Sequence, residues 1–215
     1  SSPADAVSIE EDILAAYAMA MSQFGWGNVV YGVRVESTDF STAGNQVIDG
    51  VATAIDASND YINVLPSLHV NFDLSEAWKL RLSATSGISR PTYTEARASQ
   101  SVDPTTPSIT GGNPDLKAEE SYGLDASLEW YFDTASILSL GAFYRSIDHV
   151  IYPGGEMVDG STLAPGVFAP GDPVPYNTFL NGKDGELSGM EVNLIYSAAD
   201  FLPSPFDGFG ISGNL

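Results

Sequence analysis

The chain has 215 residues, of which 28 are acidic and 8 are basic, so its formal net charge is −20. This excess of negative charge disfavours nucleic acid and other polyanions as partners, because like charges repel. Cysteine is absent, which excludes disulfides, thiolate catalysis and cysteine-ligated zinc. Apolar residues make up 43% of the chain and charged residues only 17%. No run reaches the roughly 18 apolar residues of a transmembrane helix.

Residues 9–24 form the first segment, and their local pattern is compatible with a helix or a strand. Ser8 and Glu11 make a capping-box pattern, and the apolar residues fall on one helical face. Residues 28–40, however, alternate apolar and polar side chains, and the short link 25–27 would pair them with the preceding segment. We therefore expect two antiparallel strands here.

Residues 41–60 lose this alternation and gain small and turn-forming residues, so we expect a long loop. Residues 61–73 and 78–89 then alternate over their whole length and are joined by a short link. Each run is about twice the usual strand length of roughly 5 or 6 residues. That is the length a tilted strand needs to cross a hydrocarbon layer of about 30 Å. The two runs predict a hairpin of a membrane β-barrel.

Residues 91–118 are a second long loop, rich in proline and glycine. Alternation returns in residues 121–132 and 138–145, which predict a second hairpin. A third long loop covers residues 152–185. Residues 189–196 then form a further strand, and the chain ends as another strand begins.

The links between the expected strands differ in length in a regular way. Short links are residues 25–27, 73–77 and 133–136, a moderate one is 198–208, and the long loops are 41–60, 91–118 and 152–185. In a meander, consecutive links lie at opposite ends, so the short links share one rim and the long loops the other. Outer-membrane barrels have this arrangement, with periplasmic turns and extracellular loops. The sequence predicts an all-β, antiparallel up-and-down meander of about seven or eight strands, forming one partial barrel domain over residues 1–215.

Aromatic side chains, including all three tryptophans, flank the short links. Membrane barrels carry such aromatic girdles where the hydrocarbon layer meets water. A soluble β-sandwich with bulky aromatics capping its core is the alternative. The residues that we assign to the girdle are Phe24, Trp26, Phe72, Trp78, Trp130, Phe132, Phe201 and Phe206.

Four short motifs follow one another along the chain: SRPTY at 89–93, GNPDLK at 112–117, LEWYF at 128–132 and FYRSI at 143–147. Together they resemble the C-terminal half of the barrel of TonB-dependent outer-membrane receptors, and the similarity extends over nearly the whole chain. The resemblance implies a barrel of about 22 strands, a separate N-terminal plug domain and a segment that engages TonB. Because neither of these two parts nor a closing strand is recognised, we expect an internal fragment of such a receptor.

No group of residues predicts catalysis or a bound metal. His69 and His149 are far apart and have no histidine or cysteine neighbour. The NGKDGE run at 181–186 does not have the spacing of an EF-hand. Asp125 and Glu129 share one strand face and are more simply interpreted as part of a polar wall. We expect no enzymatic activity, no cofactor and no metal.

Charged side chains on the polar face of the strands are better candidates for contact with a ligand. Such residues avoid lipid by facing water or a plug, where they either pair with one another or contact a ligand. The resemblance implies that the long loops also contribute to ligand binding. The candidates assigned to the inner face are Arg34, Glu36, His69, Arg81, Arg90, Glu129, Arg145 and Glu191.

The sequence thus indicates a fragment of an energy-coupled transporter in the outer membrane of a Gram-negative bacterium. It would import a scarce ligand, either a ferric siderophore or an oligosaccharide, and acidic loops slightly favour the sugar. The expected partners are outer-membrane lipid, a small extracellular ligand, and TonB through the N-terminal part of the parent protein. A passive porin-like or autotransporter barrel and a soluble carbohydrate-binding sandwich remain as alternatives.

Overall fold

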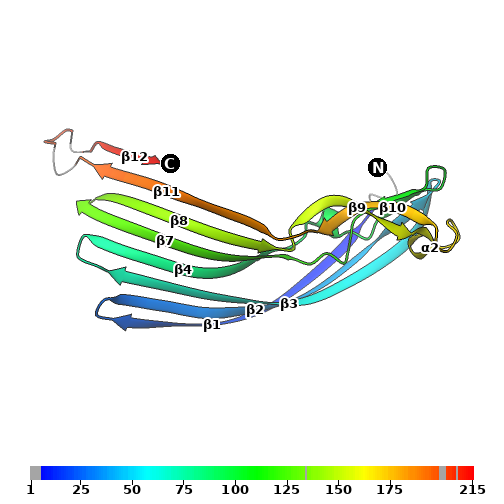
Figure 1. The fold of residues 1–215 in the computed structure, drawn as a ribbon, viewed down its shortest axis with the longest axis horizontal. Helices are drawn as coiled ribbons and strands as arrows, with labels where there is room; N and C mark the ends of the chain where they lie inside the picture. Colours follow the sequence, from blue (N-terminus) through cyan, green and yellow to red (C-terminus); the bar gives the residue numbers. More distant parts are fainter. Residues whose placement is uncertain (1–5, 134, 199–201, 207) are drawn as a thin grey trace.

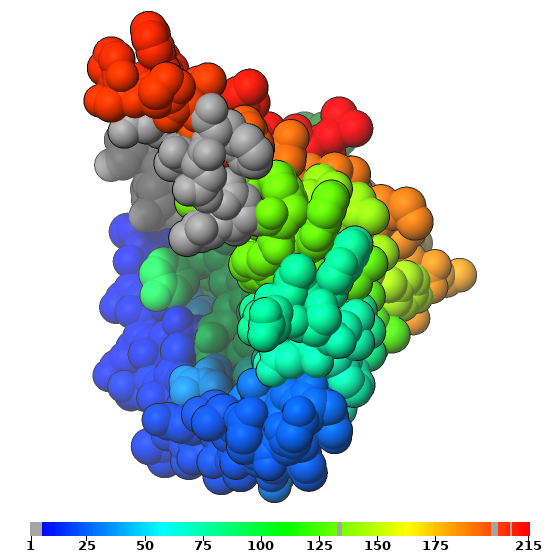
Figure 2. Space-filling model, turned by 90° about the vertical axis from the view of Figure 1, so that its left-hand side faces the viewer, coloured from blue at the N-terminus to red at the C-terminus, as the bar shows by residue number. Residues whose placement is uncertain are grey.

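The computed structural model describes residues 6–133, 135–198, 202–206 and 208–215. Within these ranges the chain forms one 12-stranded sheet, which curls into an open half-barrel (Figures 1 and 2). A single curled sheet contradicts the sandwich alternative. Among the described residues, no helix is long and apolar enough to cross a membrane.

Eight strands of the described chain make up the curled wall, and each pairs antiparallel with the next strand of this series. They are β1 (Ser8–Phe24), β2 (Gly27–Ile48), β3 (Val51–Asp73), β4 (Trp78–Ser89), β7 (Glu119–Asp133), β8 (Ser136–Asp148), β11 (Gly185–Ser197) and β12 (Gly210–Asn214). The predicted meander of seven or eight strands is confirmed. The turns from β1 to β2, from β3 to β4 and from β7 to β8 lie at one end, and the long connections lie at the other, together with the tip of β2 and β3 (Figure 1).

The ambiguous first segment is a strand, and the helical interpretation of residues 9–24 is wrong. β1 pairs with β2 without interruption from Phe24↔Gly27 to Ser8↔Ala43. The two antiparallel strands satisfy the hydrogen-bonding needs of each other's backbone N–H and C=O groups along this whole length. These hydrogen bonds stabilise the strand more than the local capping-box pattern would stabilise a helix.

Residues 41–60 are not a long loop. β2 and β3 stay in register from Gly27↔Phe72 to Ile48↔Val51 and are joined by only Asp49 and Gly50. Both turn residues have positive φ, 47° and 80°, the conformation of a tight type I′ hairpin turn. The apolar–polar alternation fades in these distal halves, although the backbone pairing of β2 with β3 continues through them.

The other two long connections contain regular structure of their own. Residues 91–118 form α1 (Tyr93–Ala96), β5 (Gln100–Asp103) and β6 (Ser108–Gly111). Residues 152–185 fall on β9 (Ile151–Asp159), α2 (Gly160–Leu163), β10 (Pro173–Asn181) and the start of β11. β5 pairs in parallel with β2, and β6 with β10, so these segments extend the sheet. The purely up-and-down description therefore holds for the wall and not for its distal end.

A small core holds this distal end together (Figure 1, right). Val102, Ile109, Ala164, Val174 and Tyr176 are buried against one another. They come from β5, β6, β10 and the segment after α2, so two connections that are far apart in the sequence form one folded unit.

Candidate functional site

One face of the wall is covered by the connection that follows β4. β5 pairs with β2 at residues 46–48, beyond the point where β1 ends. To reach that edge from β4, the connection must cross β3 and β2. It does so over the polar face, where the Ala98 N–H donates to Thr42 Oγ1 (3.2 Å) and the Asn59 amide donates to the carbonyl of Leu116 (3.1 Å). The polar face is therefore the inner face of the half-barrel.

The first charged cluster on the inner face is centred on Glu36. Arg34 Nε lies 2.5 Å from Glu36 Oε1, and Arg90 Nη2 lies 2.5 Å from Glu36 Oε2. Arg90 also donates to Thr38 Oγ1 (3.1 Å), and its Nε lies 3.7 Å from Glu11. These contacts fasten the start of the crossing connection to β2.

Arg90 lies on the inner face, as predicted, but not because of its position in the alternation of β4. We assigned it to the polar alternation of β4, but it is even-numbered while the polar positions of that strand are odd. β4 ends at Ser89, so the chain direction changes and the guanidinium can turn to the inner face.

Two further ion pairs line the wall between neighbouring strands. Arg81 lies 2.8 Å from Glu129, which also accepts a hydrogen bond from the Tyr131 hydroxyl (2.7 Å). Arg145 lies 2.7 Å from Asp125. The arginines and Glu129 of the predicted set thus contact other wall residues, as the interpretation of mutual pairing expects, and a role in ligand contact stays a prediction.

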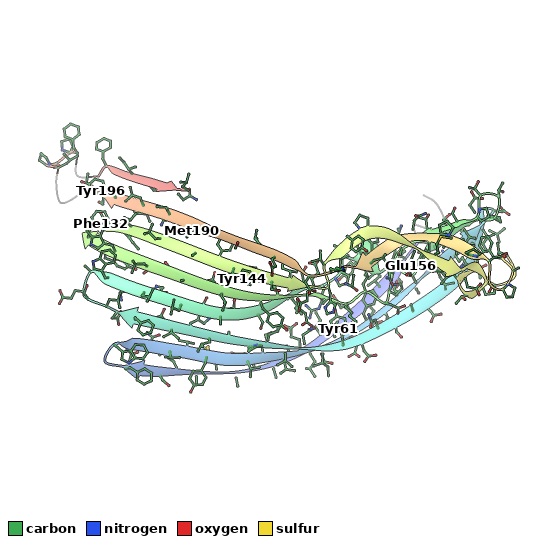
Figure 3. All side chains as sticks on the ribbon, viewed as in Figure 1. Tyr61, Phe132, Tyr144, Glu156, Met190 and Tyr196 are labelled. Carbon is green, nitrogen blue, oxygen red and sulfur yellow. The ribbon has the colours of Figure 1, made fainter. Side chains whose placement is uncertain are left out.

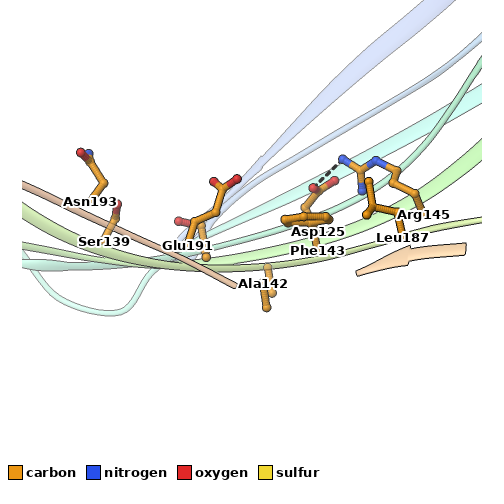
Figure 4. Close-up of a pocket in the computed structure, with 11 residues that line it drawn as sticks. Asp125, Ser139, Ala142, Phe143, Arg145, Leu187, Glu191 and Asn193 are labelled. Atoms are coloured by element: carbon orange, nitrogen blue, oxygen red, sulfur yellow. Dashed lines mark hydrogen bonds and ion pairs between the residues drawn. The ribbon is translucent and has the colours of Figure 1, made fainter. Parts of the chain in front are cut away.

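Glu191 and His69 lie on the same inner face by register, since Glu191 is opposite Gly141 and His69 is opposite Ser83. Glu191 borders a depression of about 490 Å³, together with Ser139, Phe143, Arg145 and Asn193. Figure 4 shows these side chains on one side of the sheet and Ala142 on the other. A carboxylate, an amide, a hydroxyl and one aromatic ring thus border the same depression, and the polar ones can form hydrogen bonds with polar groups placed there.

The distal connections are bridged by asparagine side chains to which the sequence analysis gave no such role. Asn113 donates to the carbonyl of Phe179 (2.9 Å). Asn181 accepts from the Lys117 N–H (2.8 Å) and donates to the carbonyls of Lys117 and His149. Only their position in turn-rich GNP and NGK runs could have indicated such bridging.

Tyr176 and Asp159 show how the distal unit is stabilised. The Tyr176 hydroxyl donates to the Gly112 carbonyl, and burial raises the pKa of this phenol. Asp159 caps α2, where the hydroxyl of Ser161 (2.7 Å) and the N–H of Gly171 (3.0 Å) lower the pKa of its carboxyl. A folded rim of this kind presents a defined surface to solvent.

Aromatic rings stack along the short-turn end of the wall. Trp26 stacks between Phe24 and Phe72, with centroid distances of 4.9 and 4.8 Å. Trp78 stacks on Trp130 at 5.6 Å, and Trp130 contacts Phe132 at 4.9 Å; Phe132 continues to Tyr196 (Figure 3). Of the remaining predicted girdle residues, Phe206 stacks on Phe209 at 6.0 Å, and Phe201 lies outside the described residues.

The described residues contain no cluster of three or more histidine, aspartate or glutamate side chains that could hold a metal ion.

The family model of the TonB dependent receptor-like β-barrel matches residues 2–215. The chain belongs to this family. Barrels of TonB-dependent receptors lie in the outer membrane. The family match therefore argues against the alternatives of a passive porin and an autotransporter. No curated protein matches the chain in a sequence search.

Solved structures of TonB-dependent receptors share the fold. The hemophore receptor HasR of Serratia marcescens is 16% identical, with a TM-score of 0.60 over 88% of this chain and 32% of its own. The ferric enterobactin receptor PfeA of Pseudomonas aeruginosa is also 16% identical, with a TM-score of 0.56 over 97% of this chain and 35% of its own. The siderophore receptor PirA of Acinetobacter baumannii is 16% identical, with a TM-score of 0.50 over 88% and 34%. The chain spans about a third of the length of these receptors.

Proposed function

We propose that the chain is part of the barrel of an outer-membrane receptor that imports an iron complex by energy coupling to TonB. The observation that supports this most directly is the family match over residues 2–215, combined with a distal end that is folded. The connections beyond the wall share one core, centred on Val174 and Ile109. A preformed rim of this kind suits capture of a small ligand, because little conformational entropy is lost on binding. The proposed role is transport, and no catalytic role is proposed.

The net charge of the distal segments restricts which iron complex they can bind. Residues 41–60, 91–118 and 152–185 together carry ten acidic and three basic residues. A strongly anionic ferric catecholate would be repelled by this surface, whereas a neutral ferric hydroxamate would not. We therefore propose a neutral or cationic iron complex as the ligand.

A linear oligosaccharide is the second candidate, because of the depression on the inner wall. Its lining combines Phe143, Ser139, Asn193 and Glu191, which offers hydrogen-bonding groups and a ring to an uncharged, hydroxyl-rich ligand.

Uptake by the complete receptor tests both candidates. The receptor would be expressed in a strain without its own ferric-siderophore receptors. The strain would be supplied with radioactive iron bound to a neutral hydroxamate, with radioactive iron bound to a trianionic catecholate, and with a fluorescent maltooligosaccharide. We expect uptake of the hydroxamate complex, loss of that uptake in a strain lacking TonB, and little uptake of the catecholate complex. Uptake of the sugar alone would support the second candidate, and catecholate uptake equal to that of hydroxamate would contradict the charge argument.

A further inference from the structure

One side of β3 has no partner strand over much of its length. β2 pairs with one side of β3 from Phe72 as far as Val51. β4 pairs with the other side only at residues 67–73, and β3 runs on past it (Figure 1). Among the residues that the structure describes, no strand pairs with this second side of β3 from Pro66 to Val51.

Pro66 explains where the pairing with β4 stops. It follows the last pair, Ser67↔Thr85, and its carbonyl accepts a hydrogen bond from the Ser86 hydroxyl (2.9 Å). Proline has no N–H to donate, so the ladder lacks its next backbone hydrogen bond. Beyond this point β4 continues along β7 alone.

The direction of the backbone groups along β3 follows from its register. In an antiparallel strand the N–H and C=O of one residue point to the same side, and successive residues alternate between the two sides. The Asp73 N–H donates to the Trp26 carbonyl on the β2 side (2.8 Å). The Leu74 N–H donates to the Trp78 carbonyl of β4 (3.0 Å). Even-numbered residues therefore point to the β4 side, and the unbroken register with β2 keeps this order up to Val51.

The even-numbered residues from 52 to 60 form what we call the open edge. Their side chains are exposed, and their backbone groups have no hydrogen-bond partner among the described residues. Just below the open edge, the Asn63 amide donates to Glu120 of β7 (3.0 Å). On the inner face, the Asn59 amide donates to the carbonyls of Pro114 and Leu116 (3.1 Å each). These contacts involve side chains of β3 and leave its backbone groups free. The residues of the open edge are Ala52, Ala54, Asp56, Ser58 and Asp60.

The open edge lies outside the hydrocarbon layer. Asp60 is 12 residues beyond Phe72 of the girdle, which is about 40 Å along a strand at roughly 3.3 Å per residue. A tilted strand uses about this length to cross the membrane. Natural proteins protect exposed strand edges with lysine, proline or a β-bulge, none of which occurs in residues 52–60. The open edge can therefore accept another strand from the surrounding water.

The outer face beside the open edge is acidic. Register places Asp12, Asp39 and Asp60 next to one another on β1, β2 and β3. The only lysine or arginine of these three strands is Arg34, which pairs with Glu36 on the inner face. A strand that bears lysine or arginine would be attracted here, whereas a second copy of this chain, with its net charge of −20, would be repelled. The exposed carboxylates of this face are Glu10, Asp12, Asp39, Asp56 and Asp60.

We propose that the open edge binds an extended, cationic segment of another protein, which adds to the sheet as a further strand. Backbone hydrogen bonds along the open edge hold the segment, and Asp56 and Asp60 select lysine or arginine side chains on its outward face. Ala52, Ala54 and Ser58 are small, so the added backbone can approach to the usual strand separation of about 4.8 Å. This site takes a polypeptide and is separate from the depression on the inner face.

Binding of designed peptides to the complete receptor in lipid nanodiscs tests the proposal. The first peptide alternates lysine with threonine, and the second has glutamate in place of lysine. The third keeps the lysines but is N-methylated at every residue, so it has the charge without the N–H donors. We expect the first peptide to bind several-fold more tightly than either of the others. Its binding should slow amide hydrogen exchange at Ala54, Asp56 and Ser58, measured residue by residue, and leave Ile55 and Ala57 unchanged because their N–H groups face β2.

Three variants of the receptor sharpen the test. Ser58→Pro removes an N–H of the open edge without removing a hydrogen bond to β2, and it should abolish binding of the first peptide. Ser58→Thr is the matched control, since it keeps the N–H and should keep the binding. Asp56→Asn, which removes charge alone, should weaken the binding and lessen its dependence on salt. This last variant keeps the proposal testable if Ser58→Pro fails to assemble.

Four results would overturn the proposal. The first is that the lysine peptide does not bind, and the second is that its N-methylated form binds equally well, since charge alone would then explain the attraction. The third is unchanged binding to Ser58→Pro. The fourth is slow exchange at Ala54, Asp56 and Ser58 in the receptor without peptide, because another part of the receptor would then already pair with the open edge.

Discussion

Replacing Leu140 with arginine tests the assignment of the two faces of the wall. Leu140 lies opposite Leu128 and Val192 and is 50% exposed, so half of its side chain faces hydrocarbon in the membrane. It is four residues beyond the start of β8, about 13 Å along the strand, and thus near the midplane. Arginine on the lipid face at this depth costs about 2–4 kcal/mol.

Ser139→Arg is the matched control, because it places the same side chain one residue away on the inner face. Ser139 borders the depression that contains Glu191, so the new guanidinium meets water and a carboxylate. We expect the free energy of unfolding to change by less than about 0.5 kcal/mol.

The measurement is reversible unfolding of the complete receptor in lipid vesicles by urea. A difference of about 2–4 kcal/mol between the two variants corresponds to a factor of roughly 30 or more in the folding equilibrium. Equal destabilisation by both variants, or a larger effect of Ser139→Arg, would refute the face assignment.

Three more perturbations follow from the structure. Arg90→Ala leaves one carboxylate oxygen of the buried Glu36 unpaired and should destabilise the barrel by about 2–3 kcal/mol, with faster proteolysis of the connection after β4; unchanged cleavage would contradict its fastening role. Gly50→Val places a β-branched residue at a φ of 80° and should cost about 1–2 kcal/mol, seen as faster amide hydrogen exchange at the tip of β2 and β3 with no change at the short turns. The hydrogen bond from the Ser161 hydroxyl is the main cause of the lowered pKa of Asp159. The ionised Asp159 carboxylate therefore stabilises the folded state above its unfolded pKa of about 3.9. This stabilisation is lost as the pH falls through the lower pKa of the folded state. Hydrogen exchange in α2 should accelerate over that acidic range in the wild type and show no such step in Asp159→Ala.

The strands of the wall could be predicted from the sequence because their two faces lie in different surroundings along most of their length. Between the girdle and the distal end, one face meets hydrocarbon and the other meets polar groups, so alternation as in residues 78–89 reports both strand and face. Beyond that region the two faces no longer meet different surroundings. Residues 41–60 therefore lack the apolar–polar alternation, although they belong to β2 and β3 apart from the Asp49–Gly50 turn. The Asp49–Gly50 pair was the signal that could have corrected this, since Asp-Gly is a strong indicator of a tight hairpin turn.

The site was less predictable, since its contacts depend on partners distant in the sequence. β5 and β6 have four residues each and pair with strands that their local pattern does not specify. The inner face of the wall was predicted by parity, but the pairing of Arg81 with Glu129 depends on the register between β4 and β7. Arg90 shows the limit of parity most clearly, because a position just past the end of a strand no longer follows the alternation.

The β2–β3 hairpin projects beyond the membrane. With 22 and 23 residues, its strands measure about 70 Å at roughly 3.3 Å per residue. A tilted strand uses about 40 Å of this in crossing the hydrocarbon layer. The remaining length places the Asp49–Gly50 tip up to about 30 Å outside that layer, stiffened by a continuous ladder of hydrogen bonds. In an outer membrane, this tip therefore stands clear of the hydrocarbon layer as a stiff projection.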